Sequence, residues 1–314
     1  MSQFDLGAAV GWEGEDQPVS WNQRDILVYG IGIGAKANDF AIINELDKSW
    51  SPFPTYPVSG TNQDVVNFRK LMTGGKHSPH LPKFDPNRGV HGSQSIEILK
   101  PLPAVSGEGW KVKKRLVAVS ENKSGIIVEI ESTVVDAHGT PYVKLYSGSF
   151  NLGAKATGSN FSKRIAGPPQ GKPVPKDRKP DWVVRDQTSP EQAVMYRLSG
   201  DYNELHINPA IGKAGGFGGV ILHGLSTFGF GARAIVEAVG GGDPASLTLF
   251  GVRFTAPVKP GDALETSIWD MGPARAPGHE GETEVAFVTK NAASGKVALG
   301  AGVAYVKKVE KSKL

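Results

Sequence analysis

The sequence predicts an α+β fold built from two tandem halves, and three features of the chain lead to this prediction. Each half contains three consecutive segments in which apolar and polar residues alternate, the pattern of strands in an antiparallel sheet. A helix that is apolar on nearly every face is predicted over residues 224–239. A proline-rich stretch over residues 154–186 separates the halves. We therefore expect a curved antiparallel sheet packed around a buried helix in each half.

The composition is that of a globular chain without disulfides. The 314 residues are 39% hydrophobic, which is enough for a large core and about two domains. No cysteine is present, so disulfides, thiolate catalysis and cysteine-ligated zinc are excluded. The seven histidines are scattered without metal-binding spacing, and no metal site is expected. No apolar run reaches the roughly 18 residues of a membrane span, and the N-terminus lacks a secretory pattern.

The charge pattern does not favour a nucleic-acid partner. The net charge is +4 and the isoelectric point is near 9.0. The basic residues gather among prolines, and a solvated linker is the expected structure there. Nucleic-acid binding would need aromatic residues interleaved with the basic ones on a folded face. The basic residues of this stretch are Lys163, Arg164, Lys172, Lys176, Arg178 and Lys179.

The last three residues form a targeting motif. Ser312, Lys313 and Leu314 match the Ser-Lys-Leu address that the peroxisomal import receptor reads at a free C-terminus. The polar residues 307–311 before them would leave the tripeptide exposed. We therefore expect a peroxisomal location, with the import receptor as a partner.

The proline-rich stretch sets the domain boundaries. We expect an N-terminal domain over 1–153, a Pro/Lys-rich linker without regular structure over 154–186, a C-terminal domain over 187–311 and the targeting tripeptide at 312–314. The predicted strands cover 111–119, 125–135 and 142–150 in the first domain, and 263–269, 282–290 and 296–306 in the second.

The helix predicted over 224–239 must be buried, because apolar residues cover nearly all of its faces. A curved antiparallel sheet wrapped around a buried helix is the hot-dog architecture, and two copies make a tandem, or double, hot dog. The matching helix of the first half is predicted over 62–72, where the pattern is weaker and more polar. This weaker helix pattern indicates that the first domain is a degenerate copy that retains a binding role and has lost catalysis.

A pair of acid/base side chains stands out in residues 196–206. Asp201 and His206 flank Asn203 directly after a Ser-Gly break, and a His223-Gly224 pair follows. A helix is predicted to begin before them with Ser189 as its cap and Gln192 completing a capping box. The pair then lies on a loop, where functional groups concentrate. Without its flanks, however, such a pair is more typical of a turn cap beside a surface histidine.

The flanks resemble a known family. Residues 196–206 are similar to the Y-R-L-S-G-D-x-N-P-L-H signature of the (R)-specific 2-enoyl-CoA hydratases, the hydratase 2 or MaoC-like group. This group includes the hydratase part of peroxisomal multifunctional enzyme type 2. Residues 222–230 continue the resemblance, and residues 24–35 and 91–103 extend it to the first half. The resemblance therefore covers nearly the whole chain and implies the double hot-dog fold.

The resemblance implies hydration of a trans-2-enoyl-CoA to a (3R)-3-hydroxyacyl-CoA in fatty-acid β-oxidation. Asp201 and His206, with Asn203 as an orienting amide, would hold one water that gives its hydroxyl to C3 and a proton to C2. The backbone N–H of Gly224, at the start of a helix, would face the thioester oxygen. No cofactor is expected beyond the coenzyme A of the substrate. Which of the two side chains protonates C2 is left open.

The resemblance also implies how the substrate is held. The first half would shelter the acyl tail and help to bind coenzyme A, with contacts at positions that match His91, Gly92, Lys123 and Phe254. From the residues alone, Lys123 is an ordinary hairpin lysine and Phe254 an ordinary core aromatic. A sheltered tail favours medium to long chains. Family resemblance and open sheet edges favour a homodimer.

The chain departs from the family signature at two positions. Glu204 stands where the family has proline, and its charge is expected to raise the pKa of His206. Asn208 stands where the family has aspartate. The first departure affects the expected rate more than the reaction type. His223 is expected to start a helix rather than to take part in catalysis.

Three other functions fit parts of the sequence. Residues 30–35 satisfy the Gly-x-Gly-x-x-Ala pattern of a dinucleotide site after an apolar stretch, but no acidic residue follows at the expected distance. A hot-dog acyl-CoA thioesterase would share the fold and the coenzyme A. A non-catalytic acyl-CoA binding module is the third alternative. The order Asp201, Asn203, His206 favours the hydratase over the thioesterase, and the intact acid/base pair argues against the binding module.

Overall fold

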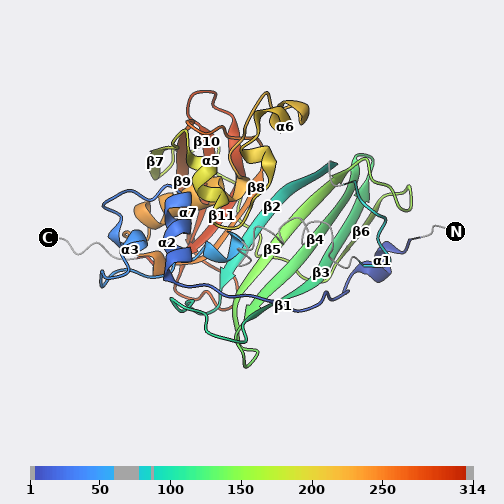
Figure 1. Ribbon diagram of the computed structural model, residues 1–314, viewed down its shortest axis with the longest axis horizontal. Helices are drawn as coiled ribbons and strands as arrows, with labels where there is room; N and C mark the ends of the chain where they lie inside the picture. The colour runs from blue at the N-terminus through green and yellow to red at the C-terminus, as the bar shows by residue number, and fades with distance from the viewer. Residues whose placement is uncertain (1–3, 60–77, 86–87, 309–314) are drawn as a thin grey trace.

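The computed structural model describes residues 4–59, 78–85 and 88–308. Within this part, eleven strands form one sheet that passes through both halves of the chain (Figure 1). The strand order is β1-β3-β4-β5-β2-β8-β11-β10-β9-β7, and β6 pairs with β3 beside this path. The predicted α+β fold with antiparallel meanders in both halves is confirmed.

The strands are β1 (Gln17–Pro18), β2 (Gly89–Ile98), β3 (Lys111–Asn122), β4 (Gly125–Val135), β5 (Pro141–Leu152), β6 (Phe161–Arg164), β7 (Trp182–Gln187), β8 (Leu247–Phe254), β9 (Ala263–Pro273), β10 (Thr283–Asn291) and β11 (Val297–Val306). The helices are α1 (Leu6–Ala9), α2 (Gln23–Gly32), α3 (Phe40–Ile43), η1 (Tyr56–Ser59), α5 (Gln192–Arg197), η3 (Glu204–His206), α6 (Pro209–Ala214), α7 (Gly224–Ala238) and η4 (Pro244–Ser246).

The two halves join through β2 and β8, which pair antiparallel in the middle of the sheet. Ser93 lies opposite Arg253, and Ile96 lies opposite Phe250. Neither strand was predicted from the sequence. The first six residues of β8 are all buried, so the chain shows no alternation there. This junction brings the end of β2 that carries His91 against the end of β8 that carries Phe254.

The helix α7 confirms the prediction of a buried central helix in the second half. Phe228 and Ile235 are fully buried, and the ring of Phe228 packs edge-on against Phe250 of β8 at 4.6 Å. The ring of Phe250 stacks in turn on Phe287 of β10 at 4.8 Å. A helix with apolar residues all round is stable only when a sheet encloses it in this way. The helix predicted over 62–72 in the first half lies outside the described residues.

The apolar segment before the glycines at 30–35 is a helix, so the dinucleotide alternative is wrong. The helix α2 begins with a complete capping box, in which the Asn22 and Asp25 side chains each accept from the other's backbone N–H. Its glycines serve helix packing, because a Cβ at Gly32 would stand 3.1 Å from the Cα of Tyr196. Without a preceding strand, the glycine pattern has no phosphate-binding turn to form. The helix α2 instead lies beside α5 and α7 (Figure 1).

The stretch 154–186 is only partly the unstructured linker that was expected. Residues 165–181 contain no strand or helix, but β6 and β7 occupy its two ends and pair with β3 and β9. Its middle is fixed against the second half, because the backbone N–H and Nζ of Lys172 lie 3.1 and 3.4 Å from the carboxylate of Glu284. The stretch 165–181 therefore has no regular structure and many exposed residues, but Lys172 attaches it to the second half.

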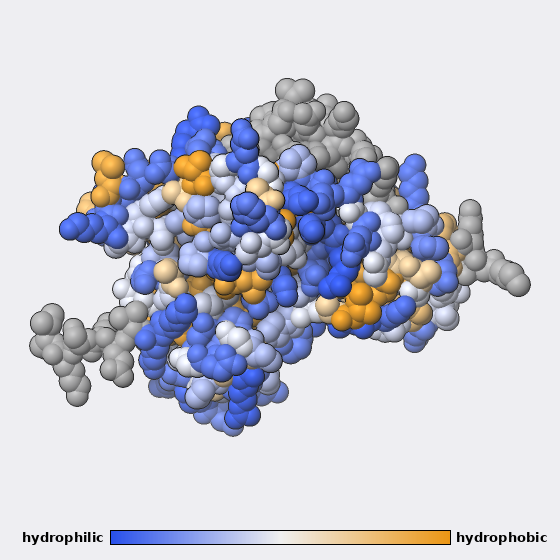
Figure 2. All heavy atoms as spheres, turned by 90° about the horizontal axis from the view of Figure 1, so that it is seen from below, coloured by the Kyte–Doolittle hydropathy of each residue, from blue (hydrophilic) through white to orange (hydrophobic). Residues whose placement is uncertain are grey.

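The face shown in Figure 2 is largely hydrophilic, and its apolar residues gather in separate small patches. None of the helices in the described ranges combines the length and the hydropathy that a bilayer-spanning segment requires.

Candidate active site

The chain reaches the site through α5 and a glycine turn. The helix begins at Gln192, three residues later than the predicted cap, and Ser189 Oγ is buried without a partner. The Gln192 side chain keeps one half of the predicted capping box, because its Oε1 accepts from the backbone N–H of Ser189 at 3.5 Å. Its Nε2 donates to the carbonyl oxygen of Gly32 at 2.8 Å and so ties α5 to α2. The helix ends at Arg197, and Gly200 follows with φ +122°, a conformation that favours glycine. This turn redirects the chain so that Asp201 faces the start of α7.

Asp201 and Asn203 organise the turn that carries His206. The Asp201 carboxylate accepts from the backbone N–H of Asn203 at 3.1 Å. The Asn203 side-chain oxygen accepts from the backbone N–H of Leu205 at 3.0 Å and caps η3. Asn203 is exposed, whereas His206 at the end of η3 is buried. The structure therefore places Asn203 as a cap, and its role as an orienting amide stays a prediction.

His206 is held as a neutral imidazole with a free Nε2. Its Nδ1 lies 3.0 Å from the carbonyl oxygen of Ile221. Because a carbonyl oxygen only accepts, Nδ1 carries the hydrogen and Nε2 keeps its lone pair. Burial lowers the pKa of His206 below its ordinary 6.5, although the carboxylate of Asp201 acts in the opposite direction. The ring is thus available as a proton acceptor at neutral pH.

The two departures from the family signature have little local effect. The pKa of His206 is lowered rather than raised, so the effect expected from Glu204 is not what the structure shows. Glu204 is the first residue of η3, where a carboxylate faces the positive end of the turn. The Asn208 side chain accepts from Ala210 N at 3.0 Å and caps α6. Asparagine and aspartate are equivalent caps at that position.

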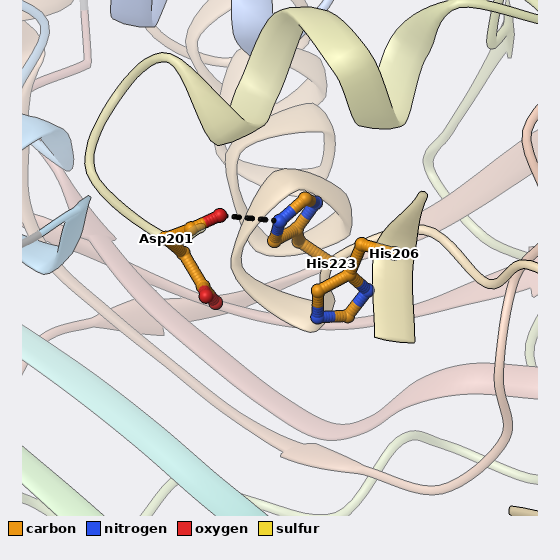
Figure 3. Close-up of side chains that lie close together, drawn as sticks. All are labelled: Asp201, His206 and His223. Atoms are coloured by element: carbon orange, nitrogen blue, oxygen red, sulfur yellow. Dashed lines mark hydrogen bonds between the residues drawn. The ribbon is translucent and has the colours of Figure 1, made fainter. Parts of the chain in front are cut away.

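His223 lies between the two predicted catalytic residues, which the sequence did not indicate. Its Nε2 donates to the backbone carbonyl oxygen of Asp201 at 3.0 Å, and its ring stacks on that of His206 at 3.7 Å and 27° (Figure 3). Burial and the neighbouring His206 lower the pKa of His223 to about 3. The fully buried ring of Tyr196 also lies beside the His223 ring, with centroids 4.9 Å apart. The His-Gly pair at the predicted helix start was the one available signal.

The side chains of Asp201, His206 and His223 have atoms within 4.8 Å of one another, a spacing that would suit a metal ion. The orientation of the rings does not. Imidazole lone pairs lie in the ring plane, and the planes of His206 and His223 are stacked nearly parallel. Two such lone pairs do not converge on one tetrahedral ion. The arrangement is better suited to proton transfer than to metal binding.

Gly224 lies at the first position of α7, directly after His223. Its backbone N–H has no carbonyl acceptor one turn earlier, and it stands at the positive end of a 15-residue helix. A Cβ at this position would be 3.3 Å from two ring atoms of Phe254. Glycine therefore lets Phe254 approach the helix start. The N–H is a donor for an oxygen that gains negative charge beside Asp201 and His206.

The first half contributes His91 to this site. The rings of His91 and Phe254 lie 4.8 Å apart, and His91 Nε2 is 3.1 Å from the hydroxyl of Ser147. Burial lowers the pKa of His91, and hydrogen bonds with Gln94 and Ser93 and the charge of Asp201 act in the opposite direction. Gly92 lies in a β-bulge between His91 and Ser93, where β2 loses its register with β5.

Lys123 is the one predicted binding residue that the structure leaves away from this group. It is exposed in the turn between β3 and β4, and its carbonyl oxygen accepts from Lys155 Nζ at 3.0 Å. That turn lies at the same end of the sheet as the start of β2, because Asn151 pairs with both Ile126 and Gly89.

The fold and the site together define a class: a double hot-dog protein with a carboxylate and an imidazole at the start of the central helix of its second half. The family model of the MaoC-like domain matches residues 172–292, and that of the MFE-2 hydratase 2 N-terminal domain matches residues 19–153. A Mycobacterium tuberculosis protein described as having a double hot-dog fold shares the architecture, with a TM-score of 0.55 at 13% identity over 94% of this chain and 95% of that one.

Closer relatives identify the family. "Probable enoyl-CoA hydratase 2" of Dictyostelium discoideum is 31% identical over 95% of this chain and 96% of its own. "Enoyl-CoA hydratase 2, peroxisomal" of Arabidopsis thaliana is 32% identical over 86% and 89%. The crystal structure of a MaoC-like dehydratase from Phytophthora capsici has a TM-score of 0.83 and 33% identity, over 97% and 98%. The chain belongs to the hydratase 2 family of MaoC-like dehydratases and is a hydro-lyase.

Proposed function

We propose that the protein catalyses the reversible hydration of trans-2-enoyl-CoA to (3R)-3-hydroxyacyl-CoA. The observation that carries the proposal is that Asp201, His206 and His223 have atoms within 4.8 Å of one another, and that Gly224 directly follows His223 at the start of α7. This set supplies a base, an acid and a donor for the thioester oxygen, the three groups that the addition of water requires. The names of the two enoyl-CoA hydratase 2 relatives support the substrate class.

In the proposed mechanism one water lies between Asp201 and His206. The Nε2 lone pair of His206 accepts a proton from it as the oxygen forms a bond to C3. The electrons of the C2–C3 double bond move toward the thioester oxygen, where the N–H of Gly224 and the helix dipole stabilise the enolate. The enolate collapses, and C2 takes a proton from the Asp201–His206 pair, so that one water is added in all. Which of the two delivers that proton stays open.

We further propose that the first half binds the substrate. His91 and Phe254, whose rings meet at the β2–β8 junction, would line the thioester. Gly92 has no side chain and would let the substrate approach the backbone of β2 closely. Lys123 would contact the distant nucleotide of coenzyme A. The acyl tail would lie along the first half, which favours medium to long chains. No cofactor takes part in this proposal other than the coenzyme A of the substrate, and activity should survive exhaustive dialysis against EDTA.

Incubation of the purified protein with trans-2-decenoyl-CoA tests the reaction. Loss of the enoyl-thioester absorbance, followed by chiral chromatography, should show (3R)-3-hydroxydecanoyl-CoA. The matched variants are Asp201→Asn and His206→Gln, each with about 10²- to 10⁴-fold lower kcat in the folded protein. Release of free coenzyme A would instead identify a thioesterase. Tight binding without turnover would leave the acyl-CoA binding module.

We propose the peroxisome as the location and the homodimer as the assembly. The peroxisomal name of the Arabidopsis relative supports the location. Fusion of a fluorescent protein ahead of the chain should give peroxisomal puncta, and removal of residues 312–314 should abolish them by preventing binding of the import receptor. Light scattering of the purified protein should give twice the chain mass of 33.3 kDa. A monomeric mass would contradict the second proposal.

A further inference from the structure

Histidine is an unfavourable residue at the position of His223, so another role must explain why it stands there. It is the N-cap of α7, where Ser, Thr, Asp and Asn are preferred because their side chains bond the first helical N–H groups. The His223 side chain makes no such bond. Its Nδ1 is buried without a partner, which costs stability. Capping and packing therefore do not account for an imidazole here.

The contacts of His223 lead instead to both proposed catalytic residues. Its Nε2–H holds the backbone carbonyl of Asp201 at 3.0 Å, and one face of its ring lies on His206 at 3.7 Å. Figure 3 shows His223 between the loop that carries Asp201 and the turn that carries His206. The backbone on either side of Asp201 is irregular and follows the glycine turn at Gly200. The bond to His223 joins this segment to the rigid start of α7.

We propose that His223 is a positioning residue for hydration, which holds the Asp201 carboxylate and the His206 imidazole at a fixed separation through one donated hydrogen bond and one stacked ring. The inference rests on the proposed function. The hydrogen bond fixes Asp201 relative to α7, and the stack fixes the plane of His206, whose Nδ1 is already held by Ile221. Both catalytic groups are thereby held relative to the start of α7, which also carries the N–H of Gly224. Such supporting contacts are typically worth 10- to 100-fold in activity.

Two substitutions separate the hydrogen bond from the ring. His223→Phe keeps an aromatic ring against His206 and loses the N–H donor. His223→Gln loses the ring but carries an amide N–H at about the reach of Nε2. We expect His223→Phe to lower kcat by about 10- to 100-fold with KM within about threefold of wild type. His223→Gln should keep kcat within about fivefold of wild type, as a rescue by the retained donor.

His279→Phe is the matched control. His279 is also a buried histidine of the second half, with its ring 4.8 Å from that of Tyr305 and its Nδ1 2.7 Å from Glu282. It lies outside the proposed site, so this variant should lose thermal stability without a change in kcat. A wild-type kcat in His223→Phe would refute a positioning role.

A spectroscopic measurement on the wild type does not depend on whether the variants fold. With ¹⁵N-labelled histidine, NMR should show His223 as the neutral Nε2–H tautomer and His206 as the neutral Nδ1–H tautomer at pH 7. A protonated ring or an Nδ1–H tautomer for His223 would overturn the proposed bond to Asp201. Wild-type protein without hydratase activity would instead contradict the proposed function, while the tautomers would still be read from the same spectrum.

Discussion

Replacing Gly224 with Ala should lower hydratase activity while leaving stability almost unchanged. The added Cβ would stand 3.3 Å from Cδ1 and Cε1 of Phe254, so the ring must move by a few tenths of an ångström. Overpacking of a rigid core costs about 1–3 kcal/mol, and the cost is smaller here because Phe254 is only partly buried. Alanine gains up to about 1 kcal/mol over glycine in a helix. The two effects nearly cancel, and the free energy of unfolding should change by less than about 1 kcal/mol.

The activity has no such compensation. The new methyl group would occupy the space between the Gly224 N–H and Phe254 in which the thioester oxygen is proposed to lie. A displacement of about 1 Å at a reacting centre costs on the order of 100-fold. We expect kcat/KM for trans-2-decenoyl-CoA to fall by about 10- to 100-fold, with urea unfolding as the stability measurement.

A second substitution tests whether Phe254 is the cause. The double variant Gly224→Ala with Phe254→Leu should recover part of the lost kcat/KM relative to Phe254→Leu alone, because the smaller side chain relieves the contact. Full activity in Gly224→Ala would refute the assignment of this N–H to the thioester oxygen. A loss of stability of several kcal/mol would show that the loss of activity comes from the fold.

Three further predictions follow from the charges and the buried imidazoles. The rate constant kcat/KM should fall as the pH drops through the pKa of His206, which burial holds below 6.5, because a protonated ring cannot accept a proton; a rate that rises toward acid pH would contradict the base assignment. Stability in urea should also fall as the pH drops below about 6.5, since the unfolded chain binds protons that the buried rings exclude, and His223→Gln should flatten this slope because the pKa of His223 is lowered to about 3. Arg233→Met should lower the free energy of unfolding in urea by about 2–3 kcal/mol, because it leaves Asp39 and Asp186 without the guanidinium that lies 2.8 and 2.7 Å from them. An unchanged unfolding midpoint would contradict this and show that Lys36 alone can compensate the charge of Asp186.

Much of the fold could be predicted because burial leaves a local signature. Alternating residues predicted β3, β4 and β5 and their counterparts β9, β10 and β11, with ends that differ by a few residues. The apolar character of α7 on all faces predicted that a sheet encloses it. The spacing of Asp201 and His206 predicted a shared site, because the residues between them can only form a short turn. In each case the information lies within about fifteen consecutive residues.

The remaining features depend on contacts between distant residues. The pairing of β2 with β8 joins Ser93 to Arg253, and no local pattern encodes that register, because the junction is buried on both faces. The prolines of 154–186 predicted the loss of regular structure but not β6 and β7, which exist because β3 and β9 supply their hydrogen-bond partners.

By itself, the sequence determined the elements with a strong local periodicity and the residue types of the acid/base pair. Only the tertiary structure decided which nitrogen of His206 is free, because that depends on the carbonyl of Ile221, fifteen residues away. It also decided that His91 of the first half packs against Phe254 of the second and that His223 links Asp201 to His206. The physical reason is that a protonation state and a separation between groups are properties of neighbours in space, which the chain sets only when its two halves close around α7.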